Sequence, residues 1–119
     1  MTEDRRPHAT DQGNAQRLVA RHGRDLRYCH PSKQWLVWDG RPWAEDQTGE
    51  VVRRAKETIR GLFDEALSTE DAATKGALLK FACGSERAER IRAMVTLAQS
   101  EPGIAILPQE LDDHPWLLN

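Results

Sequence analysis

Cysteine is scarce in this 119-residue sequence, which has only two, Cys29 and Cys83. They fall in different expected elements and share no spacing that is typical of a metal site. Two such residues do not build the disulfide framework of a small secreted protein. The sequence therefore predicts reduced thiols, as in a cytosolic protein.

Long hydrophobic runs are also missing. No segment approaches the roughly 20 apolar residues that are needed to cross a bilayer. The first ten residues, MTEDRRPHAT, contain no apolar stretch that would serve as a signal peptide. We therefore expect a cytoplasmic protein without membrane contact. Residues 1–10 are predicted to form a disordered tail and residues 11–119 a single domain.

The chain has little net charge, because 17 basic and 19 acidic residues leave only −2. With 39% hydrophobic and 30% charged residues, it has the composition of an ordinary globular domain. No global field draws such a protein to nucleic acid or to an anionic membrane. Any contact with nucleic acid must come from a local patch.

Familiar catalytic motifs are absent from the sequence. A P-loop needs a glycine-rich turn that ends in Gly-Lys-Ser/Thr, whereas Lys75-Gly76 has the pair reversed. A zinc site needs about four clustered ligands, and Cys29-His30 has no second pair. Asp112-Asp113 are adjacent in an extended segment, so their side chains do not converge on one metal. We therefore expect no catalytic residue, no metal, no cofactor and no enzyme activity of the chain on its own.

The aromatic segment near the start of the chain predicts a small antiparallel sheet. Strands are expected near residues 26–29, 34–38 and 41–44, with a hairpin turn at Asp39-Gly40. Alternation along the second strand places Trp35 and Val37 on one side and Leu36 and Trp38 on the other. Both faces of the sheet should therefore be covered.

Helices account for most of the remaining sequence. The first is expected to begin at the N-cap Asn14 and to stop at Gly23, with Arg17 and Arg21 on its outer side. A long helix capped by Thr48 carries an apolar stripe of Val52, Ala55, Ile59, Leu62, Phe63 and Ala66.

Two further helices follow on either side of Gly84. One is capped by Ser68 or Thr69 and carries Ala73, Ala77, Leu78, Phe81 and Ala82, and the next starts at Ser85 with Ala88, Ile91, Val95 and Ala98 facing inward. After Glu101 the chain is expected to be irregular. The predicted fold class is α+β: mainly helical, with about three short antiparallel strands packed on three to four helices.

Two basic clusters are candidate phosphate-binding surfaces. Arg53, Lys56 and Arg60 share one side of the long helix, and Arg17 and Arg21 belong to a second cluster with Arg24 and Arg27. The competing interpretation is a solvated face that is balanced by neighbouring carboxylates.

Three tryptophans add a second candidate feature. Trp35 and Trp38, with Trp43, stand near arginines and would stack unpaired bases. The competing interpretation makes them the core of the small sheet, which needs large side chains to bury enough area.

Several short runs form a combined pattern over residues 10–119. They are Thr10-Asp11-Gln12-Gly13-Asn14-Ala15-Gln16-Arg17-Leu18-Val19, His22-Gly23, Leu26-Arg27-Tyr28, Trp35-Leu36-Val37-Trp38-Asp39-Gly40, Trp43, Ala55-Lys56, Ser100-Glu101-Pro102-Gly103-Ile104 and Pro115-Trp116-Leu117-Leu118-Asn119. This pattern resembles the domain that precedes the superfamily 3 helicase in phage and plasmid primase–helicases. That domain is related to the amino-terminal domain of the poxvirus-type replicative NTPase.

The resemblance implies an accessory or linker domain that positions or loads a helicase during DNA replication. It implies a helicase domain or subunit as partner, oligomerisation through that helicase, and single-stranded DNA as a candidate ligand. In the family, the closing Leu-Leu-Asn run leads into another strand and later a P-loop ATPase. We therefore expect a domain truncated at its C-terminal end, and no catalytic residue is carried over.

Two other functions stay open at this point. The helices around Gly84, with Arg87, Arg90 and Arg92 on the second, are compatible with a free-standing helix-turn-helix DNA-binding module. Alternatively, the chain is a protein-interaction domain that docks a replication partner through the end at Trp116.

Overall fold

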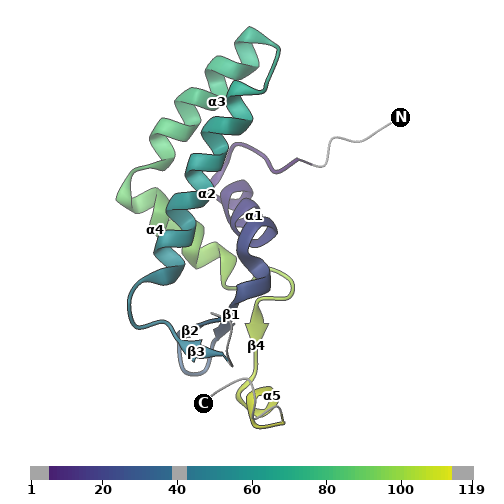
Figure 1. Cartoon of the computed structure of the whole chain (residues 1–119), viewed down its shortest axis with the longest axis vertical. Coiled ribbons are helices and arrows are strands. Elements are labelled where there is room, and N and C mark those ends of the chain that lie inside the picture. The colour runs from purple at the N-terminus through teal and green to yellow at the C-terminus, as the bar shows by residue number, and fades with distance from the viewer. Residues whose placement is uncertain (1–5, 39–42, 114–119) are drawn as a thin grey trace, which may run out of the picture.

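The computed structural model describes residues 6–38 and 43–113 (Figure 1). Its elements, in chain order, are α1 (Asp11–His22), a 3-10 turn (Gly23–Asp25), β1 (Leu26–Cys29), β2 (Gln34–Val37), β3 (Ala44–Glu45), α2 (Glu50–Leu67), α3 (Ala72–Ser85), α4 (Ala88–Ala98), β4 (Ala105–Ile106) and α5 (Pro108–Asp113). The predicted class, α+β and mainly helical, is confirmed.

Helices α2 and α3 form a long antiparallel pair that projects from the rest of the molecule (Figure 1). Helix α1 packs against α4 and α2 at the base of this pair, whereas α3 packs mainly against α2. The small sheet lies below the helices (Figure 1). The helical layer therefore covers one face of the sheet.

The sheet has four strands in the order β3-β2-β1-β4. β1 pairs with β2, and β2 with β3, in antiparallel fashion, as predicted. The sequence did not predict the fourth strand, β4, which pairs with β1 in parallel, with Tyr28 opposite Ala105. The observed sheet is mixed.

β4 lies in the segment that was expected to be irregular. A turn at Pro102-Gly103 precedes it, closed by the Ile104 amide, which donates to the Glu101 carbonyl at 3.1 Å. Gly103 has φ of 84°, which glycine adopts without the steric cost of a side chain. The turn returns the chain alongside β1, where Ile104 and Ile106 are both buried.

β3 begins later than expected. The prediction of a strand over 41–44 gives way to Ala44–Glu45, which pairs with Leu36 and Val37. The expected Asp39-Gly40 turn lies outside the described residues. The assignment of the two faces of β2 is confirmed, because Val37 and Trp35 belong to one apolar cluster and Leu36 and Trp38 to the other.

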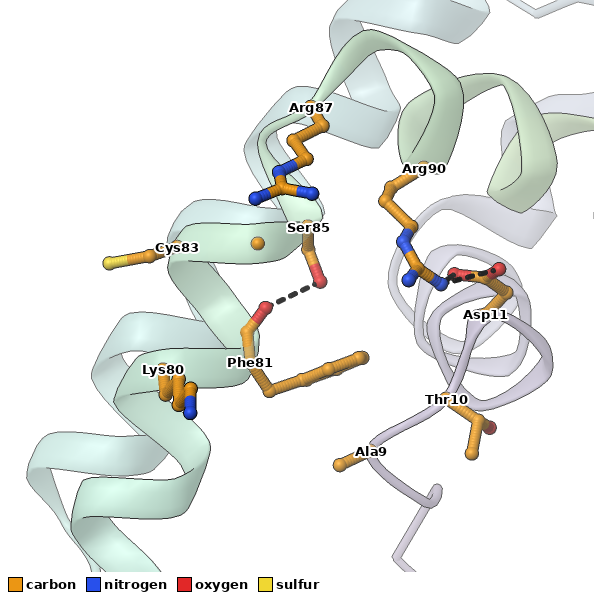
Figure 2. Close-up of a pocket in the computed structure, with 10 residues that line it drawn as sticks. Ala9, Thr10, Asp11, Lys80, Phe81, Cys83, Ser85, Arg87 and Arg90 are labelled. Carbon is orange, nitrogen blue, oxygen red and sulfur yellow. Dashed lines mark hydrogen bonds and ion pairs between the residues drawn. The ribbon is translucent and has the colours of Figure 1, made fainter.

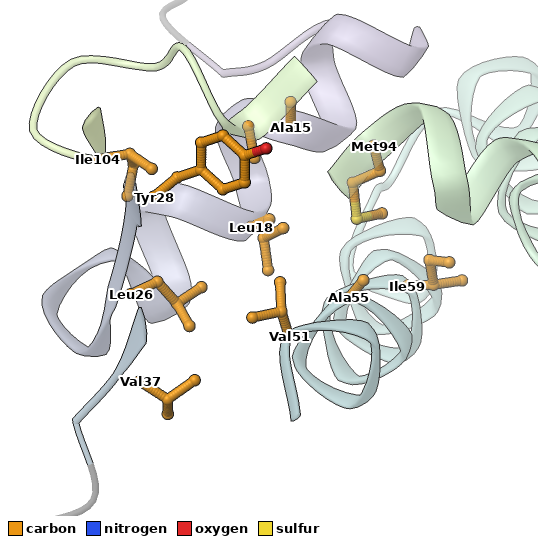
Figure 3. Close-up of a cluster of buried hydrophobic side chains, with 11 residues drawn as sticks. Ala15, Leu18, Leu26, Tyr28, Val37, Val51, Ala55, Ile59, Met94 and Ile104 are labelled. Carbon is orange, nitrogen blue, oxygen red and sulfur yellow. The ribbon is translucent and has the colours of Figure 1, made fainter. Parts of the chain in front are cut away.

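The main core lies between the helices and one face of the sheet (Figure 3). Its largest fully buried side chains come from α1, β1, α2, α4 and the residue before β4: Leu18, Leu26, Val51, Met94 and Ile104. A smaller cluster on the opposite face contains Cys29, Leu36, Trp43 and Ile106, with Trp38 packed against it. Each face of the sheet thus has its own cluster.

The N-cap of α1 is Thr10, not Asn14. The Thr10 hydroxyl accepts a hydrogen bond from the Gly13 amide at 2.9 Å, which satisfies one of the free amides of the first turn. Asn14 is 1% exposed, and its side-chain nitrogen donates a hydrogen bond to the Ser85 hydroxyl of α3 at 3.0 Å. The predicted end of the helix at Gly23 is correct.

The N-cap of α2 is Gly49, which has φ of 79° and no side chain to cap the helix. Asp46 supplies the cap that was predicted for Thr48: its carboxylate accepts from the Glu50 amide at 2.9 Å and from the Val51 amide at 3.0 Å. Val51 rather than Val52 faces the core, and Val52 is 40% exposed, so its place in the predicted stripe is wrong.

The boundaries of α3 and α4 also differ from those expected. Asp71, not Ser68 or Thr69, caps α3 by accepting from the Thr74 amide at 2.8 Å. α3 continues through Gly84 to Ser85, and Arg87 is the N-cap of α4. Of the side chains that were expected to face inward, Ala73, Ala77 and Ala88 are exposed.

Candidate nucleic-acid interface

The predicted basic face of α2 consists of exposed side chains. Arg53, Lys56 and Arg60 are all exposed on the side away from the buried residues of the helix. Arg53 forms an ion pair with Glu50 one turn earlier. Within residues 6–38 and 43–113, Lys56 and Arg60 form no ion pair, so their charges are available to an external anion.

Arg21 reaches the same helix from α1. It is exposed and lines a groove of about 310 Å³ between α1 and α2. A Cβ at Gly61 would lie 2.2 Å from its Nη1 atom, so the guanidinium lies directly over that glycine. Gly61 costs α2 some intrinsic stability, and its missing side chain leaves room for the Arg21 guanidinium.

The sequence predicted Arg17 on the outer side of α1, but the structure places it in a buried position. Its side chain is 9% exposed and donates to the carbonyl oxygens of Pro7 and His8, both at 2.7 Å, and to Glu65 of α2 at 3.3 Å. The guanidinium fork satisfies several acceptors at once. Arg17 therefore anchors the chain before α1, and the predicted tail is held at its end next to that helix.

The two tryptophans of the predicted interface are half-buried. Trp35 packs edge-on against Tyr28, with ring centroids 5.1 Å apart, and Trp38 packs against Trp43 at 5.7 Å. Trp43 is itself buried, with the Arg27 guanidinium 4.9 Å from its ring centroid. These contacts favour the competing interpretation, in which the aromatic residues pack into the apolar clusters on the two faces of the sheet.

Arg54 is a residue whose role the sequence did not indicate. It is half-buried and donates to Glu50 at 2.9 Å and to Asp25 at 3.3 Å. The hydrogen bond with Glu50, opposed by burial, raises the pKa of Arg54 above its ordinary value. Arg54 thus connects α2 to the turn after α1. The sequence pattern of α2 did not indicate this contact, because Asp25 lies far from Arg54 along the chain.

Neither a metal-ligand group nor a membrane-spanning helix occurs among the residues that the structure describes. In the part of the chain that it describes, no group of three or more His, Cys, Asp and Glu side chains is placed to hold a metal ion. Among the same residues, no helix has both the length and the apolar character needed to cross a bilayer.

Comparisons with known proteins give one match. No curated protein and no solved structure matches the chain. A family model described as D5 N terminal like matches residues 15–119. This confirms the resemblance seen in the sequence, and the match covers every described element after the first turn of α1. The chain therefore belongs to the D5 N terminal like family, the non-catalytic N-terminal domain of D5-like phage and poxvirus primase–helicase proteins.

Proposed function

We propose that this chain is a cytoplasmic accessory domain that positions or loads the helicase of a phage- or prophage-type primase–helicase during DNA replication. The observation that carries this proposal is the family match over residues 15–119. The helicase domain or subunit is the expected partner, and any oligomer is expected to form through it.

Direct contact with single-stranded DNA is the second part of the proposal. Lys56 and Arg60 are exposed without ion pairs among the described residues, and Arg21 is a further exposed cation, which lies over Gly61 of the same helix. Exposed cations bind phosphates by releasing condensed counterions, and such binding weakens steeply with salt. Because the chain carries a net charge of −2, we expect weak affinity that depends strongly on ionic strength.

The chain itself is proposed to have no catalytic activity and to need no cofactor. The non-catalytic character of its family supports this. Incubation of the purified chain with ATP and single-stranded DNA should release no phosphate above the buffer blank. Hydrolysis that co-purifies with the chain and follows its concentration would contradict the proposal.

The proposed partnership with a helicase is tested first by sequencing the DNA around the gene. The DNA downstream of codon 119 should continue into, or lie close to, a reading frame that contains a Gly-Lys-Ser/Thr P-loop. When the chain is mixed with that helicase, both should elute together in gel filtration. A locus without such a frame would remove the helicase from this account.

The proposed function and the alternative of a free-standing duplex-binding module predict opposite preferences for DNA. If the proposed function is right, fluorescence anisotropy should show tighter binding to a single strand than to a duplex of the same length at the same salt concentration. Sequence-selective duplex binding would favour the helix-turn-helix alternative instead.

A further inference from the structure

A cleft of about 730 Å³ opens where the chain before α1 faces the corner between α3 and α4 (Figure 2). Its volume falls in the range of small-molecule sites. None of its residues belongs to the basic face of α2. The residues that give it its chemical character are Asp11, Lys80, Phe81, Ser85, Arg87 and Arg90.

The charged lining of this cleft is mainly basic. Lys80, Arg87 and Arg90 contribute three positive charges against the single carboxylate of Asp11. Arg90 donates to Asp11 at 3.1 Å, which leaves two cations in excess. Lys80 and Arg87 are exposed and form no ion pair with any described residue. The lining of the cleft therefore carries a net positive charge.

The cleft also contains an aromatic ring. The half-buried Phe81 projects from α3 toward the side of Ala9 and Thr10, and Arg87 and Arg90 extend from the corner between α3 and α4 above it (Figure 2). A planar apolar face beside free cations fits a base and its phosphate together, because every nucleobase has a face that can stack.

The wall that carries Phe81 is fixed before any ligand arrives. Ser85, only 2% exposed, donates to the Phe81 carbonyl at 2.9 Å and accepts from the Asn14 side chain at 3.0 Å. These bonds hold the last turn of α3 against α1. A preformed site loses less entropy on binding than a mobile one.

We propose that this cleft holds one nucleotide unit, with its base against Phe81 and its phosphate at Lys80 and Arg87. The inference deepens the proposed contact with single-stranded DNA and rests on it for the source of the nucleotide. The basic face of α2 is made of Arg53, Lys56 and Arg60, which offer phosphate contacts alone. The cleft would add a stacking contact that these cations do not provide.

The proposed stacking on Phe81 is tested by comparing the affinities of two DNA strands for the wild type and for a Phe81 variant. An oligothymidylate of about twelve nucleotides and an abasic strand of equal length are titrated into the wild type and Phe81→Leu by fluorescence anisotropy at low salt. The wild type should bind the abasic strand about ten-fold more weakly, and Phe81→Leu should bind both strands alike. Equal loss of affinity on Phe81→Leu for both strands would overturn stacking.

The proposed phosphate contacts are tested at exposed residues, because replacement of an exposed side chain should leave the fold intact. The double variant Lys80→Ala, Arg87→Ala should bind both strands more weakly than the wild type, and its binding should depend less on salt. Arg92→Ala is the matched control, because Arg92 is an exposed arginine of α4 outside the cleft. If the control and the double variant lose equal affinity, the cleft is not the site.

Amide shifts separate failure of the cleft from failure of DNA binding. In ¹⁵N spectra, the strand should shift the amides of Thr10, Gly84 and Ser85 in the wild type. Anisotropy binding without these shifts would overturn the cleft and leave the DNA-binding proposal standing. No binding of the strand and no shift would overturn both. Shifts that thymidine monophosphate alone produces at the same concentration would keep the nucleotide site and identify free nucleotide as its source.

Discussion

The side-chain nitrogen of Asn14 donates a hydrogen bond of 3.0 Å to the hydroxyl of Ser85, 71 residues further along the chain. Both residues are buried, at 1% and 2% exposure. The Asn14 oxygen accepts from Arg17 at 3.3 Å, and the Ser85 hydroxyl donates a hydrogen bond to the Phe81 carbonyl at 2.9 Å. This continuous set of polar contacts fixes the end of α3 on α1.

Replacing Asn14 with alanine should lower the free energy of unfolding by about 2 kcal/mol, because Ser85 and Arg17 each lose a buried partner. Urea denaturation of the two single variants and the double variant gives the coupling between Asn14 and Ser85. We expect a coupling of about 1 kcal/mol for Asn14→Ala with Ser85→Ala. Strict additivity of the two losses would show that the hydrogen bond contributes nothing to stability.

Gly13 and Gly76 should respond in opposite ways to alanine. Alanine within a helix normally gains up to about 1 kcal/mol over glycine, and nothing lies within 4 Å of a Cβ at Gly76. A Cβ at Gly13 would lie 1.8 Å from the His8 carbonyl oxygen, so the anchored chain before α1 must move. Thermal melts should therefore show Gly76→Ala to be more stable than the wild type and Gly13→Ala less stable. Stabilisation by both would mean that this close approach is not maintained in solution.

Asp46 controls the start of α2. Burial raises the pKa of Asp46, but the hydrogen bonds from the amides of Val51 and Glu50 outweigh it and hold that pKa below its ordinary value. Removing the carboxylate in Asp46→Ala should cost about 1–2 kcal/mol of stability in urea denaturation. Asp46→Asn keeps one acceptor oxygen and should cost less. An alanine variant as stable as the asparagine one would argue against capping by this side chain.

His22 should make stability depend on pH. Burial and the Arg54 guanidinium lower the pKa of His22 below its ordinary value of 6.5, and Glu57 acts in the opposite direction. The unfolded chain therefore binds a proton at higher pH than the folded one. This contribution to stability is complete above pH 6.5 and is lost as the pH falls from there through the lower pKa of the folded state.

His22→Gln provides the comparison, because the remaining histidines are common to both proteins. Urea midpoints measured over a series of pH values should fall more steeply on acidification in the wild type than in the variant. Identical slopes would mean that His22 takes up its proton equally well in the folded and unfolded chain.

The features predicted correctly from the sequence depend on neighbours along the chain. Alternation alone assigned Trp35 and Leu36 to opposite faces of β2, and helical spacing placed Lys56 and Arg60 on the exposed side of α2. In each case the pattern repeats within one element. Such patterns report which way a side chain points before any tertiary contact is known.

The features that were missed depend on residues far apart in sequence. β4 is two residues long, and its pairing with β1 becomes visible only when the helices bring Ala105 beside Tyr28. The alternating Ile104 and Ile106 after Pro102-Gly103 were its one local signal. Arg17 was misplaced because its acceptors lie in Glu65 and in the chain before α1. The cleft lined by Phe81 and Arg87 likewise arises only from the folding of α3 and α4 against α1.

The salt dependence of single-strand binding tests the central claim most directly. Each phosphate contact on a single strand contributes about −0.7 to the slope of log K against log salt concentration. Lys56→Ala with Arg60→Ala should therefore reduce the steepness of this slope by about 1.4 for two lost contacts, while Arg92→Ala should leave it unchanged. A wild-type chain that binds no single strand at low salt, or a double variant with the wild-type slope, would contradict the account.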